Sequence, residues 1–197
     1  IEELVADSDV LTGSLPGGIG GRSGVHREGF TPFSFLMYKQ LYDTTGRPIE
    51  GAFADLNADG IINENDRYIY KNPDPDATFG FSSNLNYKNF DFSFFMRASI
   101  GNRVFNQVKA GRAYSTYALS ADAQLSNIPT SYFDNEFSIG AAETILSDLY
   151  IENGSFLRMD NITLGYTFPK FLDGKASLRL FTGCQNAFII TKYSGLD

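Results

Sequence analysis

Apolar and polar side chains alternate along several stretches of the chain, and this pattern predicts β-strands with two unlike faces. Between residues 78 and 88 one parity is apolar, comprising Phe79, Phe81, Leu85 and Tyr87. The other parity is small or polar. Because successive strand side chains point to opposite faces of a sheet, the stretch predicts one apolar face and one polar face.

The same alternation continues directly after this first strand. Lys88 and Asn89 predict a tight turn, because Asn tolerates left-handed backbone geometry. In the strand expected over residues 90–100 the even-numbered positions are apolar, and Phe95 is the exception on the other parity. Three further strands are expected, over residues 33–42, 155–168 and 175–190.

Long and short connections alternate between these expected strands. Residues 43–76 and 102–150 form long connections, whereas residues 88–89 and 169–174 form short turns. Outer-membrane barrels combine long extracellular loops with short periplasmic turns. We therefore expect an all-β fold, an antiparallel transmembrane β-barrel segment. A soluble β-sandwich also shows alternation, but large aromatic and aliphatic residues on one parity favour the membrane barrel.

The expected strands are too few to form a barrel by themselves. A membrane barrel needs about eight strands, and open sheet edges in lipid would leave backbone groups unpaired. Residues 33–197 are therefore expected to be part of a barrel that other strands complete. Residues 1–32 are Gly-rich and polar, and they predict a loop or irregular lead-in. No signal peptide is recognised at the start of the sequence.

The composition agrees with a barrel and argues against other classes of protein. Aromatic residues make up 15% of the chain, with 18 Phe and 11 Tyr, as expected for aromatic girdles. The net charge of -7 argues against nucleic-acid binding. The single cysteine, Cys184, and the single histidine, His26, exclude a disulfide framework and a His-based triad within the chain. No constellation of acid, base and nucleophile is present, so we expect no enzyme activity.

One loop carries a candidate metal site. Oxygen-bearing side chains alternate after Asp55, with Gly60 at the sharp turn, in the spacing of a calcium-binding loop. Ile61 would offer its backbone carbonyl, and Asn63 is expected to act through water. The candidate calcium ligands are Asp55, Asn57, Asp59, Ile61, Asn63 and Asp66. Since Asp66 replaces the usual Glu, the affinity is expected to be modest. The alternative is a turn rich in Asp, Asn and Gly that holds no metal.

Several segments of the sequence are more specific than the alternation of apolar and polar residues. In the same order along the chain, they resemble segments of the C-terminal barrel of the SusC/RagA family of TonB-dependent transporters. The segments are Gly51–Arg67, Lys71–Phe81 with Asn86–Phe92, Asn153–Tyr166, and Gln185–Asn186 with Thr191–Asp197. Together they are spread over most of residues 33–197, whereas residues 1–32 contribute little.

The resemblance implies a function as well as a fold. It implies a barrel of about 22 strands with a plugged lumen, in the outer membrane of a Gram-negative, Bacteroidetes-type cell. It implies the import of oligosaccharide or peptide cargo with a SusD-like lipoprotein as lid, energised through TonB. The plug, the TonB-contacting segment and the final strand are expected to lie outside these residues. The competing interpretation is a calcium-stabilised soluble cell-surface β-domain for glycan binding or adhesion.

Overall fold

The computed structural model describes residues 1–3, 9–14, 22–119, 128–138 and 146–195. The chain forms two compact units. The first comprises Ile1–Asp74, Arg103–Asn153 and Ser194–Asp197, and the second comprises Pro75–Asn102 and Gly154–Tyr193. None of the described helices has both the length and the hydropathy that crossing a membrane requires.

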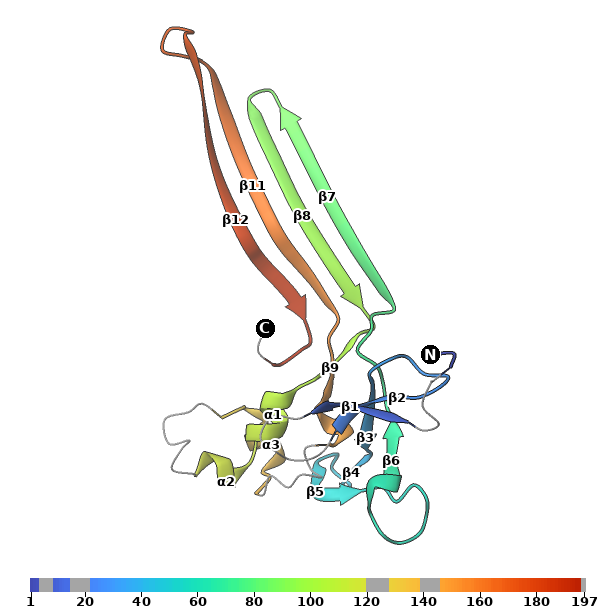
Figure 1. Ribbon diagram of the computed structural model, residues 1–197. Helices are drawn as coiled ribbons and strands as arrows, with labels where there is room; N and C mark the ends of the chain where they lie inside the picture. The colour runs from blue at the N-terminus through green and yellow to red at the C-terminus, as the bar shows by residue number, and fades with distance from the viewer. Residues whose placement is uncertain (4–8, 15–21, 120–127, 139–145, 196–197) are drawn as a thin grey trace. The chain divides into compact units, whose positions relative to one another are not determined.

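The second unit is one antiparallel sheet of four long strands, in the order β12-β11-β8-β7 (Figure 1). Its strands are β7 (Ala77–Tyr87), β8 (Phe90–Ile100), β11 (Phe156–Phe171) and β12 (Ala176–Thr191). The alternation in the sequence predicted all of them to within a few residues. At the turn between β7 and β8, Lys88 has a φ of 55°, the left-handed geometry that a tight hairpin needs.

Strand pairing gathers the apolar parities of the four strands on one face of this sheet. Directly opposed residues in an antiparallel pair share a face. Phe81 pairs with Met96, and Leu85 pairs with Phe92. Phe92 in turn lies opposite Leu164 of β11. The expected division into an apolar and a polar face is therefore confirmed across strands.

A β-bulge in β11 changes the parity within that strand. Asn161 lies opposite Phe95 on the polar face, but Met159 lies opposite Met96 on the apolar face. The extra residue between them is Asp160, and a bulge of this kind adds one residue to one strand of a pair. The apolar face therefore takes odd-numbered residues of β11 before Asp160 and even-numbered residues after it. Simple alternation did not predict this change.

The first unit is built from short strands, and it differs from the predictions for residues 1–32 and 33–42. Residues 1–32 were expected to be irregular, but they contain β1 (Val10–Ser14) and β2 (Arg22–His26). The expected strand over 33–42 is divided into β3 (Ser34–Tyr38) and β4 (Gln40–Tyr42). All of β3 is buried, so it lies in a core and has no exposed apolar face.

The remaining elements of this unit belong to the two long connections. The sheet β1-β2-β3-β6 is completed by β6, while β4 pairs with β5 and β9 pairs with β10. The additional strands are β5 (Pro48–Phe53), β6 (Arg67–Ile69), β9 (Arg103–Phe105) and β10 (Ile151–Asn153). Short helices follow, namely η1 (Glu64–Asp66), α1 (Gln107–Arg112), α2 (Ser115–Ala118), α3 (Ser131–Asn135) and η3 (Asp148–Tyr150).

Side chains from distant parts of the sequence form the core of the first unit. Tyr38 stacks on Phe53 at 5.0 Å between ring centroids. Met37 and Tyr150 are almost completely buried in the same cluster, together with Ala110 of α1. The core thus joins residues of both long connections, so the described parts of these connections form helices and strands and not only loops.

Candidate functional site

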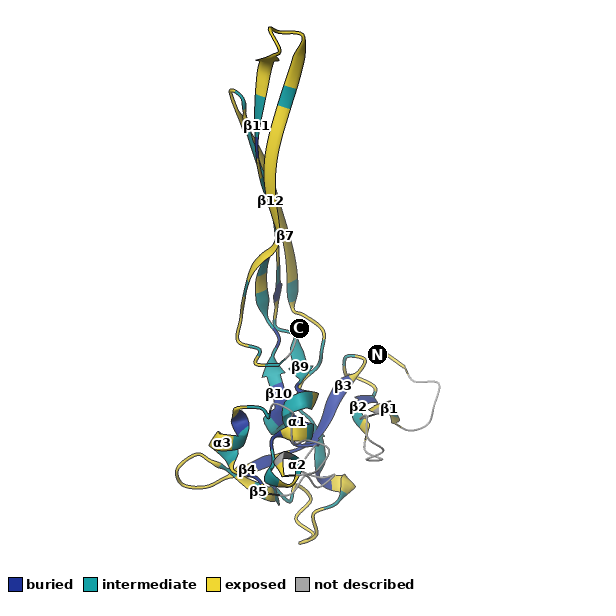
Figure 2. Ribbon diagram, turned by 90° about the vertical axis from the view of Figure 1, so that its left-hand side faces the viewer, coloured by how far each residue is buried: buried dark blue, intermediate teal, exposed yellow. Residues whose placement is uncertain are grey.

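The apolar face of the four-stranded sheet leaves large side chains without cover. Phe81 is 56% exposed and Tyr87 is 70% exposed, and most of the sheet is exposed along its length (Figure 2). Aromatic rings nevertheless meet on this face, with Phe81 and Phe94 at 5.5 Å and Phe90 and Tyr166 at 4.7 Å. Soluble monomers rarely expose an apolar surface this continuous. The sheet therefore has the chemistry of a membrane-facing wall.

The polar face of the sheet carries an ion pair that spans a whole strand. Arg179 of β12 donates to Asp91 of β8, with Nε 2.9 Å from Oδ1 and Nη2 2.5 Å from Oδ2. Gly165 of β11 lies between them, opposite both Asp91 and Phe181. A Cβ at this glycine would come within 2.5 Å of both carboxylate oxygens of Asp91. The ion pair can cross β11 only because residue 165 has no side chain.

A second ion pair on the sheet involves the bulge. Arg97 donates through Nε to Asp160 Oδ2 at 2.6 Å and through Nη2 to Oδ1 at 3.1 Å. Such a bidentate geometry is the strongest form of an Arg–carboxylate contact. The sequence placed Arg97 and Arg179 on the polar parity, and the register confirms this for both.

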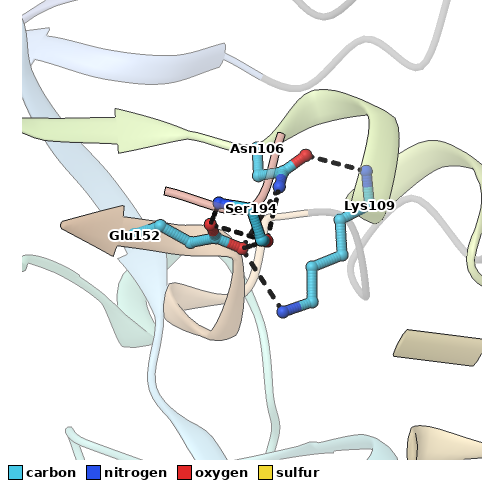
Figure 3. Close-up of polar contacts among 4 residues, drawn as sticks. All are labelled: Asn106, Lys109, Glu152 and Ser194. Atoms are coloured by element: carbon cyan, nitrogen blue, oxygen red, sulfur yellow. Dashed lines mark hydrogen bonds and ion pairs between the residues drawn. The ribbon is translucent and has the colours of Figure 1, made fainter. Parts of the chain in front are cut away.

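In the first unit, Glu152 of β10 is the centre of a polar cluster (Figure 3). Its carboxylate accepts hydrogen bonds from the backbone N–H of Ser194 at 2.9 Å and from Asn106 Nδ2 at 3.1 Å. It also pairs with Lys109 Nζ at 3.3 Å. Burial opposes ionisation of this carboxyl, but the hydrogen bonds from Ser194 and the charge of Lys109 outweigh it and lower its pKa. Glu152 thus anchors the segment after β12 to α1.

A cavity of about 660 Å³ lies beside this cluster. Its lining includes Asn106, Lys109 and Ser194 of the cluster, and Arg112 at the end of α1. Residues of α3 and of the segment before it contribute to the wall, with Thr130, Ser131 and Asp134 as the polar ones. Small-molecule sites usually measure about 300–1,000 Å³ and combine apolar walls with a few polar groups. Sequence patterns did not predict this cavity, because its residues lie in separate parts of the connection 102–150 and after β12.

The structure places the candidate calcium ligands on one loop between β5 and β6. Gly60 has a φ of 81°, as the expected sharp turn requires. The oxygens of Asp55 accept hydrogen bonds from the backbone N–H groups of Ala58 and Gly60. Asp59 accepts from the backbone N–H of Ile61, and the carbonyl of Ile61 accepts from Asn63 Nδ2. The loop therefore satisfies many of its oxygens internally.

Asp66 plays a different part in this loop from the one expected. It is fully buried, and its Oδ1 accepts from the backbone N–H of Leu56 while Oδ2 accepts from that of Asn63. The Asn63 N–H is the main cause of its lowered pKa, and burial opposes the shift. Within the described residues no three Asp, Glu, His or Cys side chains converge as a metal site would require. In this conformation Asp66 closes the loop through backbone contacts.

The fold defines a class: a segment of a large antiparallel β-barrel of the kind found in TonB-dependent transporters. The chain superposes on the RagAB peptide importer in its open-open state with a TM-score of 0.64 at 19% identity, covering 98% of this chain and 22% of that one. For the closed-closed state the TM-score is 0.59 at 17% identity, covering 95% and 22%. No protein-family model matches the chain.

Sequence comparison then gives the family. The chain is 42% identical over 177 residues to the TonB-dependent receptor SusC of Bacteroides thetaiotaomicron, covering 87% of this chain and 17% of that protein. It is 36% identical over 152 residues to the TonB-dependent receptor P3 of Formosa agariphila, covering 74% and 15%. The chain belongs to the TonB-dependent receptors of the SusC/RagA family, and it spans less than a fifth of the length of these curated relatives.

Proposed function

We propose that this chain forms part of the barrel wall of an outer-membrane importer driven by TonB. The observation that carries the proposal is the uncovered apolar face of β7, β8, β11 and β12, with its paired aromatic rings. Lipid is the solvent for such a face, since strands of membrane barrels alternate apolar-out and polar-in. The ion pairs of Arg97 and Arg179 then face the lumen.

The proposed cargo is an oligosaccharide or a peptide, taken up together with a SusD-like lipoprotein. Family membership supports this proposal, because its sequence relatives include SusC and its structural neighbours include an importer described as a peptide importer. The remainder of the barrel, the plug and the contact with TonB are proposed to be provided by residues other than these. The curated relatives are receptors and not enzymes, consistent with the expectation of no catalysis.

The soluble alternative is not favoured. A calcium-stabilised cell-surface β-domain would need its apolar face covered by protein, yet the described sheet has no second layer on that face. The two sequence relatives compared above are TonB-dependent receptors.

An uptake experiment tests the proposed function directly. Cells that carry the receptor, cells that lack its gene and cells that lack TonB are incubated with fluorescent oligosaccharides and fluorescent short peptides. We expect uptake of one cargo class only in cells with both the receptor and TonB. Removal of the SusD-like lipoprotein should reduce that uptake. Equal uptake of both classes in all strains would contradict the proposal.

We also propose that the loop from Asp55 to Asp66 binds calcium. The alternating oxygens and the left-handed Gly60 support this proposal. The carboxylates of Asp55 and Asp59 and the carbonyl of Ile61 would hold the ion, with Asn57 and Asn63 beside them. Asp66 would have to release a backbone contact in order to take part. The role proposed for the ion is to make this loop rigid.

Calcium titration of the full-length receptor tests this second proposal. Cleavage after Glu64 by the glutamyl endopeptidase Glu-C is followed with calcium, with EDTA and with magnesium. Asp59→Asn should remove protection by calcium, whereas Asp43→Asn in the neighbouring β4–β5 turn should not. Cleavage at the same rate with calcium and with EDTA would show that the loop is a metal-free turn.

A further inference from the structure

We propose that the cavity beside Glu152 binds a small ligand that carries a carboxylate together with a hydroxyl or ammonium group. This inference rests on the proposed import function, because it assigns a cargo-binding subsite to these residues. The cavity of about 660 Å³ is lined by residues of α1, of α3 and of the segment after β12. It therefore lies wholly within the first unit.

The charge balance of the lining points to an anionic group on the ligand. Lys109 is already paired with Glu152 at 3.3 Å. Arg112, in contrast, makes no ion pair with any described residue. Its guanidinium lies 5.6 Å from the centre of the Tyr117 ring. The planar fork of an Arg matches a carboxylate in bidentate geometry, and stacking on an aromatic ring holds the fork in place.

A buried hydroxyl provides a second and independent sign of a ligand. Ser131 lines the cavity and is only 8% exposed, and its Oγ has no hydrogen-bond partner in the described structure. Leaving a buried polar group unsatisfied is costly, so such groups are nearly always bonded to protein, water or a ligand. The Oγ exposes almost no surface in its present rotamer, so a carboxylate or hydroxyl of a bound ligand would satisfy it after a rotation of the side chain about χ1.

The rest of the lining defines what else the ligand must carry. Asp134 follows Ser131 on α3 and is the one carboxylate among the described lining residues. It would accept a hydrogen bond from a hydroxyl or ammonium group of the ligand, and it would repel a carboxylate placed against it. Val108, Ile128 and Pro129 give the cavity an apolar side, against which a sugar ring or an alkyl group can pack.

Two sources provide this chemistry, and the experiment separates them. One is a glycan that contains uronic acid, and the other is a peptide with a free terminal carboxylate. Full-length receptor in detergent is titrated by calorimetry with trigalacturonate and with trialanine. The counterparts that lack a carboxylate are galactotriose and trialanine amide. We expect one of the two carboxylate probes to bind, and its counterpart without the carboxylate to bind at least about tenfold more weakly, as expected for loss of a hydrogen bond to a charged group.

Variants connect the binding to this cavity. Arg112→Gln should weaken binding of that probe by about tenfold or more, and Ser131→Ala by about threefold to tenfold, in line with the loss of charged and neutral hydrogen bonds. The matched control is Lys39→Gln, which removes the same charge from an exposed position outside the cavity. Ser131→Ala removes only an unpartnered hydroxyl, so it should fold even if Arg112→Gln does not.

The outcomes separate this proposal from the proposed function. Binding of trialanine alone assigns the site to peptides, and binding of trigalacturonate alone assigns it to acidic glycans. The proposal is overturned if neither carboxylate probe binds, if the counterparts without a carboxylate bind equally well, or if Ser131→Ala and Arg112→Gln both leave affinity unchanged. TonB-dependent uptake that persists in those cases would leave the import function standing. Uptake that does not depend on the receptor would overturn the import function instead.

Discussion

At the scale of single residues, Gly165 is a position where the sheet has no room for a side chain. A Cβ there would meet both oxygens of Asp91 and come within 2.7 Å of Arg179 Nη2. We expect Gly165→Ala to break the Asp91–Arg179 ion pair and to lower the temperature at which the full-length barrel unfolds. Gly183→Ala is the matched control, since its Cβ would have no neighbour nearer than 3.4 Å. Heat-dependent mobility in gel electrophoresis measures the transition, and equal loss in both variants would refute the explanation.

Asp66 makes the loop between β5 and β6 sensitive to acid. Its pKa is lowered mainly by the backbone N–H of Asn63, so its contribution to stability is present above the unfolded pKa of about 3.9. That contribution is lost as the pH falls through the lower folded pKa. We expect the amides of Leu56 and Asn63 to be protected from hydrogen exchange at pH 6 and to lose protection below about pH 4. Asp66→Asn should abolish most of the protection at pH 6, and protection that does not change with pH would contradict this role.

At the scale of elements, the two faces of β7 should respond in opposite ways to charge. Leu85 lies on the apolar face opposite Phe92, and Asn84 lies on the polar face opposite Ser93. Leu85→Arg should destabilise the barrel by up to about 2–4 kcal/mol, depending on its depth in the bilayer. Asn84→Arg should change stability little, because it faces the lumen. The free energy of unfolding in lipid vesicles measures both, and a larger loss for Asn84→Arg would reverse the assignment of faces.

The elements also show what the sequence could predict. Strands β7, β8, β11 and β12 were recognisable because alternation is a local signal that survives over many residues. The bulge at Asp160 was not, since one inserted residue leaves no trace in composition. The strand over 33–42 was misassigned to the wall because all of β3 is buried, and a fully apolar run does not reveal which face meets lipid.

The candidate sites differ in the same way, because a site could be predicted only where its residues lie close together in the sequence. The calcium loop could be proposed because its residues are consecutive. The cluster of Asn106, Lys109, Glu152 and Ser194 could not, because pairs such as Asn106 and Glu152 meet only through the pairing of β9 with β10. Ser131 and Arg112 were equally hidden, since neither residue type is unusual in a polar connection.

At the scale of the whole molecule, the sheet is an open piece of a closed structure. Its outer strands β7 and β12 pair with no further strand in the described part of the chain. Unpaired strand edges are not stable within hydrocarbon, so other strands must complete the wall. The chain's 22% share of the RagAB transporter chain agrees with that requirement.

Lipid accessibility along β7 tests the central claim most directly. With Cys184→Ser as background, single cysteines from Thr78 to Tyr87 are spin-labelled one at a time in the full-length receptor in bilayers. Collision rates with oxygen, which dissolves in lipid, and with a water-soluble nickel reagent are then measured. We predict that oxygen reaches the odd-numbered positions from Phe79 to Tyr87, which share a face with Phe92 and Phe94, while the nickel reagent reaches the even-numbered positions. Equal access of the nickel reagent to both parities would show that this sheet does not face lipid.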